Sequence, residues 1–361
     1  MRGLRLNGVS YRAGSELWLR DIDLHLVAGQ INVLLGATSA GKTTLLRIMA
    51  GLDQPSSGRI YDGERDVTGL PVRQRNVAMV YQQFINYPSL TVYENIASPL
   101  RIARRSAAEI DAKVAALAQT LHLTPFLSRY PAELSGGQQQ RTALARALAK
   151  DAGLLLLDEP LVHLDYKLRE ELRLELAQLF AQQNTTVVYA TTEPFEALQL
   201  GGHTAVLLEG RLLQFGPTLE VFRRPATLAA ARAFSDPPLN VLPAQLDSER
   251  VTARLNDGTR LQLPRSVQAA ATAEVLLGIR AHELALSRTT PQQVAIGGRV
   301  ELAEISGSQT FIHLARDDVP LVAQVAGVHD FSLNEPCTLY LEPGSLYGFD
   351  RDGRLLFAPE R

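Results

Sequence analysis

A glycine-rich segment near the N-terminus has the residue types and spacing of a phosphate-binding loop. Residues 36–43 read Gly-Ala-Thr-Ser-Ala-Gly-Lys-Thr, which fits the pattern Gly-x4-Gly-Lys-Ser/Thr. Glycines let the backbone wrap around phosphates, and amide groups at a helix N-terminus attract them. The predicted nucleotide-binding residues are Gly36, Ala37, Thr38, Ser39, Ala40, Gly41, Lys42, Thr43 and Thr44. Lys42 would bridge the β- and γ-phosphates of ATP, and the Thr43 hydroxyl would coordinate Mg²⁺.

Two acidic residues follow a run of leucines at residues 154–157. A buried strand that ends in an acid places a carboxylate at the edge of a sheet, beside a phosphate loop. Asp158 would hold Mg²⁺, and Glu159 would polarise the attacking water as a general base. Such a pair alone is more typical of a solvated strand end or a helix cap. The phosphate loop upstream favours the catalytic interpretation.

Residues 134–141, Leu-Ser-Gly-Gly-Gln-Gln-Gln-Arg, separate this chain from a kinase, a GTPase or a motor. Ser135 would cap a helix that opens with Gly136, Gly137 and Gln138, which makes a second anion-binding helix terminus. One nucleotide does not need two such termini from one chain. The simplest geometry has this terminus capping the γ-phosphate on a partner's phosphate loop, which predicts a head-to-tail dimer with ATP between the subunits.

The elements that position these residues are typical of an α/β protein with parallel strands. A strand at residues 30–35 precedes the phosphate loop, and a helix at residues 42–50 follows it. Residues 153–157 and 186–190 are continuous apolar runs, as expected of strands covered on both faces. An amphipathic helix at residues 166–183 lies between those two runs.

The pattern changes near residues 236–238, Asp-Pro-Pro, where the prolines end a helix. Short alternating runs follow, and Asn-Asp-Gly at residues 256–258 is a strong hairpin signal. Further strands are predicted around residues 275–279, 300–305, 310–314 and 338–341. The C-terminal third is therefore predicted to be a small all-β barrel or sandwich without a catalytic constellation.

Bulk properties limit the partners of the chain. The 361 residues carry a formal net charge of −2, so no basic excess points to nucleic acid, and we expect no nucleic-acid partner. The single cysteine, Cys337, fits a buried apolar position in a strand and a reducing compartment. The N-terminus does not resemble a signal peptide, and no apolar run is long enough for a membrane helix. A role at a membrane would require docking onto other membrane-spanning subunits.

At this point the sequence resembles a known family, the ATPase subunits of ABC transporters. The resemblance covers essentially the whole chain and is nearest to the sugar, polyol and glycerol-phosphate import ATPases related to that of the maltose importer. It implies an ABC ATPase domain at residues 1–235, with a helical subdomain at about 88–150, and an OB-like regulatory or dimerisation domain at residues 236–361. ATP and Mg²⁺ are the implied cofactors.

The resemblance also implies an assembly. The partners would be two transmembrane permease subunits, a second ATPase subunit and, indirectly, an extracytoplasmic substrate-binding protein. The location would be peripheral, at the cytoplasmic face of the inner membrane.

Further site residues come only from this resemblance. Tyr11 matches the aromatic residue that stacks on adenine, and Gln82 matches the glutamine that senses Mg²⁺ and the attacking water. Asp165 matches the aspartate that contacts the partner across the dimer. The segment at residues 87–95 resembles the region that receives the coupling helix of the membrane subunit.

One position departs from the family pattern. Thr192 stands where the family places a histidine that reaches the γ-phosphate, and a threonine hydroxyl lacks the protonation chemistry of imidazole. His203 lies too far along the chain to substitute, and His163 fits a solvent or packing role better. Either the chain pairs with a different ATPase that carries the histidine, which we favour, or it forms a homodimer with an altered or slower switch.

Other functions remain open at this stage. The chain could be a mainly regulatory subunit that binds ATP without hydrolysing it, or a non-transport ABC ATPase that acts on DNA or the ribosome. The complete Asp158–Glu159 pair argues against an inert subunit. Residues 38–40, 83–86 and 192–194 look most like the ATPases of glycerol importers, which places glycerol or a related polyol first among substrates.

Overall fold

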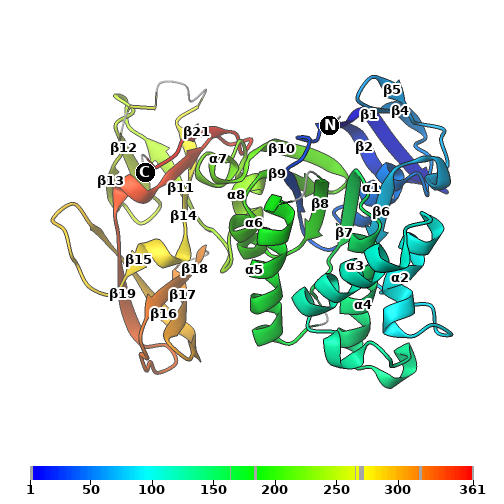
Figure 1. The fold of residues 1–361 in the computed structure, drawn as a ribbon. Helices are drawn as coiled ribbons and strands as arrows, with labels where there is room; N and C mark the ends of the chain where they lie inside the picture. The colour runs from blue at the N-terminus through cyan, green and yellow to red at the C-terminus, as the bar shows by residue number, and fades with distance from the viewer. Residues whose placement is uncertain are drawn as a thin grey trace. The chain divides into compact units, whose positions relative to one another are not determined.

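The computed structural model describes residues 3–162, 164–182, 185–264, 266–267, 272–316 and 319–359. The chain folds as two compact units, Met1–Thr218 and Leu219–Arg361. The first unit holds the phosphate loop, the acidic pair and the motif at residues 134–141, and the second is built almost entirely from strands (Figure 1). This confirms the predicted fold class, an α/β cassette followed by a small all-β domain.

A six-stranded sheet forms the centre of the first unit, in the order β10-β9-β3-β8-β7-β6. Neighbouring strands from β9 to β6 are parallel, and β10 pairs antiparallel with β9. The strands are β3 (Ile31–Leu35), β6 (Val77–Val80), β7 (Leu154–Asp158), β8 (Thr186–Thr191), β9 (His203–Leu208) and β10 (Arg211–Pro217). Because parallel strands end at the same edge, the segments that follow β3, β6, β7 and β8 meet there.

A second, four-stranded sheet has the order β2-β1-β4-β5. Its strands are β1 (Leu4–Ala13), β2 (Glu16–His25), β4 (Ser57–Asp62) and β5 (Arg65–Asp66). Helix α1 (Lys42–Ala50) touches β2 as well as β6, β7 and β8. Its apolar side chains, together with Leu6 and Leu19 of the small sheet and Leu156 and Val188 of the large one, form one buried core.

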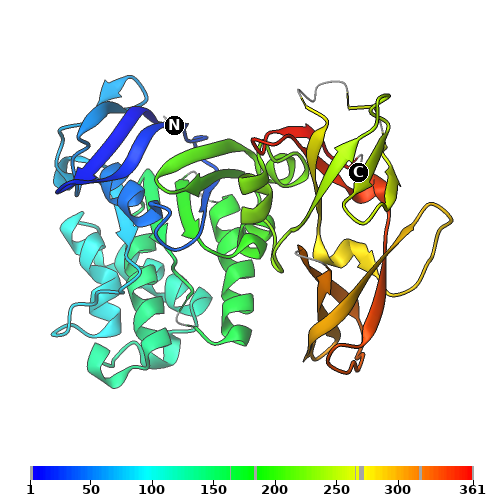
Figure 2. The ribbon, with the colours of Figure 1, turned by 180° about the vertical axis from the view of Figure 1, so that it is seen from behind.

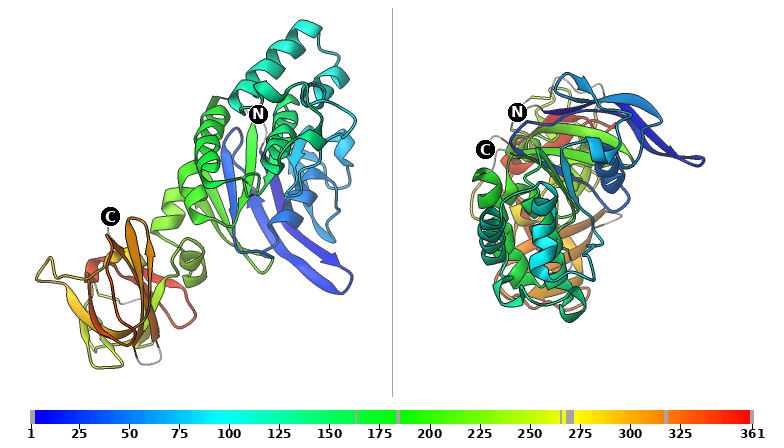
Figure 3. Two further views of the ribbon diagram at one scale, coloured as in Figure 1. Left: turned by 90° about the horizontal axis from the view of Figure 1, so that it is seen from below. Right: turned by 45° about the vertical axis from the view of Figure 1, so that its right-hand side comes forward.

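Some helices of the first unit cover the large sheet, and others pack mainly on one another (Figure 2). In the left view of Figure 3, α5 and α6 lie on one side of the sheet and α1 on the other. Helices α2, α3 and α4 pack on one another, and α4 also contacts β6. Their bounds are α2 (Val92–Ile102), α3 (Ala107–Thr120), α4 (Gly136–Ala149), α5 (Tyr166–Gln182) and α6 (Pro194–Leu200). Short 3-10 turns occur at Val72–Gln74, Thr124–Phe126 and Pro131–Glu133.

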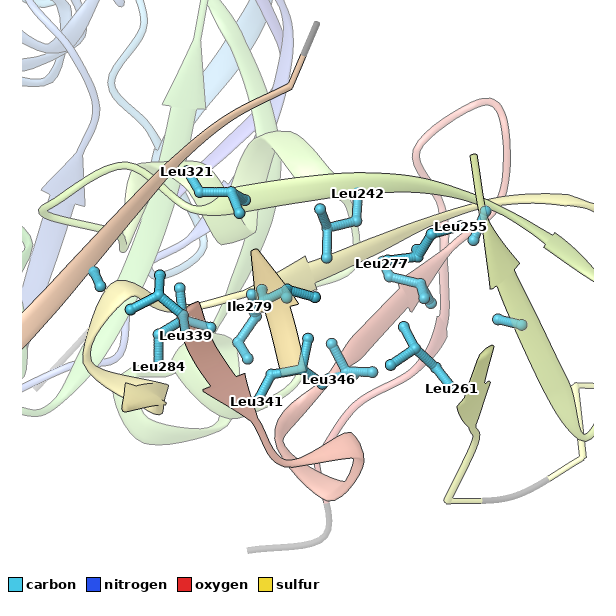
Figure 4. Packing of buried hydrophobic residues seen from close by; sticks show 14 of the residues in the cluster. Leu242, Leu255, Leu261, Leu277, Ile279, Leu284, Leu321, Leu339, Leu341 and Leu346 are labelled. Carbon is cyan, nitrogen blue, oxygen red and sulfur yellow. The ribbon is translucent and has the colours of Figure 1, made fainter. Parts of the chain in front are cut away.

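The second unit packs two antiparallel sheets around one hydrophobic core (Figure 4). One sheet has the order β13-β12-β11-β14-β20-β21, and the other has the order β15-β19-β16-β17-β18. Side chains alternate between buried and exposed along β11 and β17, as expected of strands with one face on a core. Leu242, Leu277 and Leu339 lie in that core. The predicted hairpin at residues 256–258 joins β12 to β13, with Gly258 at φ 89°.

The strands of the second unit are β11 (Asn240–Leu246), β12 (Thr252–Leu255), β13 (Arg260–Gln262), β14 (Glu274–Ile279), β15 (Leu284–Ala285), β16 (Val294–Ser306), β17 (Gln309–Arg316), β18 (Val319–Ala326), β19 (Pro336–Leu341), β20 (Tyr347–Phe349) and β21 (Leu355–Phe357). Two 3-10 turns lie at Ala281–Glu283 and Pro343–Ser345. Cys337 is buried in β19, as predicted.

The second unit begins at Leu219, ahead of the change of pattern at Asp236, because two short helices belong to it. These are α7 (Thr218–Arg223) and α8 (Leu228–Ala233). The guanidinium group of Arg280 donates to the carbonyls of Phe222, at 3.0 Å, and Phe234, at 2.9 Å. It also lies 3.9 Å from the centre of the Phe222 ring. One buried cation therefore ties both helices to the strands.

Replacing Arg280 with methionine should selectively destabilise the second unit. The variant leaves the buried carbonyls of Phe222 and Phe234 without donors, which costs about 3 kcal/mol and lowers the unfolding temperature of this unit by several degrees. Scanning calorimetry measures the shift. The control is Arg351→Met, because the side chain of Arg351 is 77% exposed and pairs with Glu274, which is also exposed. Equal effects of the two substitutions would contradict this account.

Candidate functional site

The phosphate loop lies between the end of β3 and the start of α1, as the motif requires. Gly41 has φ 98°, which favours glycine. At Gly36 a Cβ atom would lie 2.4 Å from the carbonyl oxygen of Leu207, so only glycine fits against β9. The first turn of α1 contains no acidic residue. Its free amide groups and helix dipole therefore form an anion-binding site.

Lys42 is buried at the first position of α1, with a side chain that is 4% exposed. Its ammonium group donates to the carbonyls of Gly36, at 2.7 Å, and Ala37, at 3.0 Å. It also lies 3.4 Å from a carboxylate oxygen of Glu159. Burial lowers the pKa of Lys42 from its ordinary value, and the carboxylates of Glu159 and Asp158 oppose that change. The loop and the acidic pair therefore hold one cation between them.

Asp158 and Thr43 form the part of the site that fits a metal ion. Asp158 ends β7 with 1% exposure, and the hydroxyl of Thr43 donates to it at 3.1 Å. Burial raises the pKa of Asp158, while the Thr43 hydrogen bond and the charge of Lys42 lower it. No group of three or more histidine, cysteine or acidic side chains that could hold a metal ion occurs among the described residues. One carboxylate and one hydroxyl suit Mg²⁺ that is shared with phosphate oxygens and water.

Glu159 follows Asp158 in a left-handed backbone conformation, with φ 47°. Its amide donates to the carbonyl of Ala190 in β8 at 3.1 Å, which turns its side chain towards the loop side of the sheet edge. One carboxylate oxygen faces Lys42, and the other accepts from the side-chain amide of Gln82 at 3.3 Å. Gln82 follows β6 and is exposed. Residues from three strand ends and the phosphate loop thus meet at one edge.

The other predicted nucleotide contacts lie elsewhere in the first unit. Ser135 and Gly136 are exposed at the start of α4, where Ser135 and Gln138 cap each other. Asp165 is exposed and caps α5 through the amide of Leu168 at 3.0 Å. Tyr11 is partly buried in β1 against the core between the sheets. These contacts lie within the chain and do not test a contact with nucleotide or a partner subunit, so those roles remain predictions.

The predicted docking segment at residues 87–95 is held by one buried side chain. Asn95 in α2 is fully buried, and its amide oxygen accepts from the backbone amide of Tyr87 at 2.8 Å. Its amide nitrogen donates to the carbonyls of Tyr87, Leu90 and Thr91. Thr91 and Glu94 form a capping box at the start of α2. The loop before α2 is therefore fixed in shape, while the ring of Tyr87 stays exposed.

Thr192 is exposed and follows the buried end of β8. The backbone on either side of it is held: the Thr191 hydroxyl donates to Glu196 at 2.6 Å and accepts from the Glu193 amide at 3.0 Å. The carbonyl of Thr191 accepts from the amide of Gly36 at 3.4 Å. Thr192 therefore directly follows a residue whose backbone is hydrogen-bonded to the phosphate loop. His163 lies outside the described residues, and His203 starts β9.

Sequence reasoning overlooked Trp18, which lies beside the phosphate loop. A Cβ atom on Gly41 would lie 3.4 Å from the carbonyl of Trp18 and 2.8 Å from the side chain of Leu19. The turn at Gly210 links the loop to β2, because its amide donates to the carbonyl of Ala40 and its carbonyl accepts from the amide of Arg20. The Trp18 side chain is 46% exposed. The presence of a single tryptophan can be read from the sequence, but nothing in the sequence places it near the phosphate loop.

The chain is similar to known proteins, both in the region of these motifs and over nearly its whole length. Residues 19–162 match the family model described as ABC transporter. The chain is 34% identical to an alpha-glucoside transport ATP-binding protein of Rhizobium meliloti, over 98% of this chain and 99% of the relative. It is 35% identical to an sn-glycerol-3-phosphate import ATP-binding protein of Yersinia pestis, over 94% of this chain and 95% of the relative. It is 36% identical to a trehalose/maltose import ATP-binding protein of Thermococcus litoralis, over 89% and 90%.

A solved structure supports the fold of the first unit. A dimeric ATP-binding cassette in a post-hydrolysis state, bound to ADP and phosphate, matches with a TM-score of 0.54 and 30% identity. The match covers 60% of this chain and 98% of that chain. The chain therefore belongs to the ATP-binding proteins of ABC transporters. It is an ATPase that binds and hydrolyses ATP as a subunit of such a transporter.

None of the helices in the described part of the chain is both long enough and apolar enough to span a membrane.

Trp18 should report nucleotide binding, because it is the only tryptophan in the chain and its backbone contacts the loop. Adding ATP should change its fluorescence in a saturable way. Lys42→Ala removes the buried cation from the site and should weaken the apparent affinity at least about tenfold. The control Lys113→Ala changes a lysine that pairs with Asp151 on the surface, and it should leave the titration unchanged. An identical titration for Lys42→Ala would remove Lys42 from phosphate binding.

Proposed function

We propose that this protein powers the import of a small polyol or sugar, with glycerol or glycerol phosphate as the first candidates. The observation that carries the ATPase part is the meeting of Lys42, Thr43, Asp158, Glu159 and Gln82 at one edge of the large sheet. The import part is supported by the names of the relatives, which are import or transport proteins for alpha-glucosides, trehalose/maltose and sn-glycerol-3-phosphate. The likeness of residues 38–40, 83–86 and 192–194 to glycerol importers favours a polyol.

In the proposed mechanism the phosphate loop binds ATP and Glu159 activates water. The oxygen of that water attacks the γ-phosphorus, its proton passes to the carboxylate of Glu159, and the bond to the oxygen bridging the β- and γ-phosphates breaks. ADP and phosphate are the products. Lys42 donates to the β- and γ-phosphate oxygens, and Gln82 orients the water. Thr43, Asp158 and Gln82 would hold Mg²⁺, which supplies positive charge to the phosphates when bound.

The proposed assembly places ATP between two ATPase subunits. Ser135, Gly136, Gly137 and Gln138 of one subunit would cap the γ-phosphate on the other, and Asp165 would contact the partner. The exposure of the start of α4 and the dimeric state of the similar cassette support this arrangement. Two transmembrane permease subunits would dock on residues 87–95 at the cytoplasmic face of the membrane, and a substrate-binding protein would deliver the solute. Tyr11 would stack on adenine.

Changing Glu159 to glutamine should trap ATP without hydrolysis. The amide fills the same volume but cannot accept the proton from water, so turnover should fall about 100-fold or more while nucleotide binding persists. Phosphate release and Trp18 fluorescence measure the two effects. The control Glu171→Gln makes the same chemical change on the exposed surface of α5, where Glu171 pairs with Lys167. Undiminished turnover in Glu159→Gln would rule out the base role.

Changing Thr192 to histidine should restore the missing switch. In the favoured assembly the partner ATPase supplies the histidine, so this chain alone should turn over slowly. The Thr192→His variant should then hydrolyse ATP about ten times faster or more, because a positioned histidine contributes at least that much to proton transfer and charge stabilisation. Thr192→Val is the control for side-chain volume. Rapid turnover by the unmodified chain as a homodimer would contradict unequal sites.

The substrate and the partner are tested together in the native membrane complex. Purifying the tagged chain with its complex and identifying the other subunits by mass spectrometry distinguishes a second ATPase from a homodimer. Adding glycerol, glycerol 3-phosphate or maltose to that complex then shows which solute stimulates ATP hydrolysis. Stimulation by maltose alone would overturn the polyol assignment.

A further inference from the structure

Arg169 joins two loops that are separate in the sequence. It lies in the first turns of α5, four residues after Asp165, and its side chain is 21% exposed. One guanidinium nitrogen lies 2.7 Å from a carboxylate oxygen of Glu193. The other donates to the carbonyls of Val162 and Leu164, each at 3.3 Å. One planar group therefore contacts Val162 and Leu164, which lie before α5, and Glu193, which follows β8.

The Glu193 end of this contact is equally well defined. The backbone amide of Glu193 donates to the hydroxyl of Thr191 at 3.0 Å, and Thr191 is buried. The carboxylate of Glu193 is held by Arg169. Thr192 lies between these two fixed residues. The backbone of Thr192 is therefore held by the contact of Glu193 with Thr191 at the end of β8 and by its contact with Arg169 of α5.

A second arginine of α5 makes a comparable contact but does not reach the loop. Arg173 is 3% exposed, and it lies 3.6 Å from Glu196 and 2.9 Å from Glu170. Its side chain also donates to Gln199 in α6 at 2.6 Å. These contacts hold α6 on α5. Among the described contacts, the link to the carbonyls of the loop that contains Asp165 belongs to Arg169.

We propose that Arg169 is a positioning residue that couples the loop at residues 161–165 to the switch position at Thr192. This inference rests on the proposed function, in which Asp165 contacts the partner subunit and Thr192 stands at the position of the switch histidine. A shift of the loop when the partner docks changes the direction of the two carbonyls. Because the guanidinium is planar and holds Glu193 with its other edge, that shift moves the backbone at Thr192. ATP turnover at this site thereby depends on the state of the dimer.

The experiment breaks the ion pair from each side in the full chain and in the assembled complex. Arg169→Gln and Glu193→Gln should each lower the ATP turnover number about tenfold, with nucleotide affinity from Trp18 fluorescence changed less than about twofold. The double variant should be no worse than Arg169→Gln alone, because that single variant already loses the contact with Glu193. A merely structural role would instead lower the unfolding temperature and change binding and turnover together.

A matched pair on the same helix is the control. Lys167 and Glu171 form an ion pair with a separation of 3.9 Å, and the Lys167 side chain is 87% exposed. Lys167→Gln should leave turnover and affinity unchanged. Arg169→Lys keeps the positive charge for Glu193 but cannot also hold both carbonyls, so its turnover should lie between those of the native chain and Arg169→Gln.

The outcomes separate this inference from the proposed function. If the native complex does not hydrolyse ATP, the proposed function fails. If the native complex is active and Glu193→Gln keeps full turnover, the coupling role of Arg169 is overturned. Additive losses in the double variant would also overturn it. Should Arg169→Gln fail to fold, Glu193→Gln and Arg169→Lys still decide whether Arg169 has a coupling role or a merely structural one.

Discussion

A nearly fully buried ammonium group, that of Lys42, sets the requirements for the rest of the catalytic unit. Burying an isolated positive charge is costly unless several oxygens replace the lost water. Here two loop carbonyls and the Glu159 carboxylate lie within 3.4 Å of it, and Asp158 adds a second negative charge nearby. Those oxygens come from the segments that follow β3 and β7, with β8 between the two strands. Parallel strands that end at one edge meet this requirement.

Close packing behind the loop keeps the cation in place. Gly36 lies against β9, Gly41 lies against Trp18 and Leu19 of β2, and the turn at Gly210 hydrogen-bonds both the loop and β2. A Cβ atom at Gly36 or Gly210 would lie 2.4 or 2.1 Å from a backbone carbonyl oxygen, so backbone would have to move. A Cβ atom at Gly41 would lie 2.8 Å from the side chain of Leu19, and its φ of 98° favours glycine in addition. The small sheet therefore does more than cover α1. Its strand β2 also packs against the phosphate loop at Gly41.

The sequence was informative where chemistry is local. The phosphate loop, the start of α4 and the Asp158–Glu159 pair are short strings whose glycines, caps and apolar neighbours act over a few residues, and the helix predicted at residues 42–50 matches α1. The all-β character of the second unit followed from alternation and a hairpin signal. In contrast, the Arg169–Glu193 pair spans 24 residues and has no local pattern. The same is true of Trp18, whose neighbour Gly41 lies on a different element.

The boundary between the units shows a related limit. A proline pair at residues 237–238 ends a helical stretch, which made Asp236 the natural place for a change of domain. The helices α7 and α8 before it carry no sequence feature that assigns them to either side. Their membership is decided by Arg280, which lies about 50 residues further on and collects their carbonyls. Such a contact can be seen only after both parts have folded.

A threonine at position 192 offers different chemistry from a histidine, but the hydrogen bonds that hold the backbone around it do not depend on that side chain. Thr191 is bonded on one side, Glu193 on the other, and neither bond involves the side chain between them. Loss of an imidazole therefore leaves the base, the phosphate loop and the metal-binding pair in place, and it removes only a group that titrates near neutral pH. In the proposed function, a site altered in this way still binds ATP and closes around it. Under the proposed assembly its rate depends on what the partner subunit supplies. The contacts of Arg169 with the carbonyls of Val162 and Leu164 are the route that we propose for that influence.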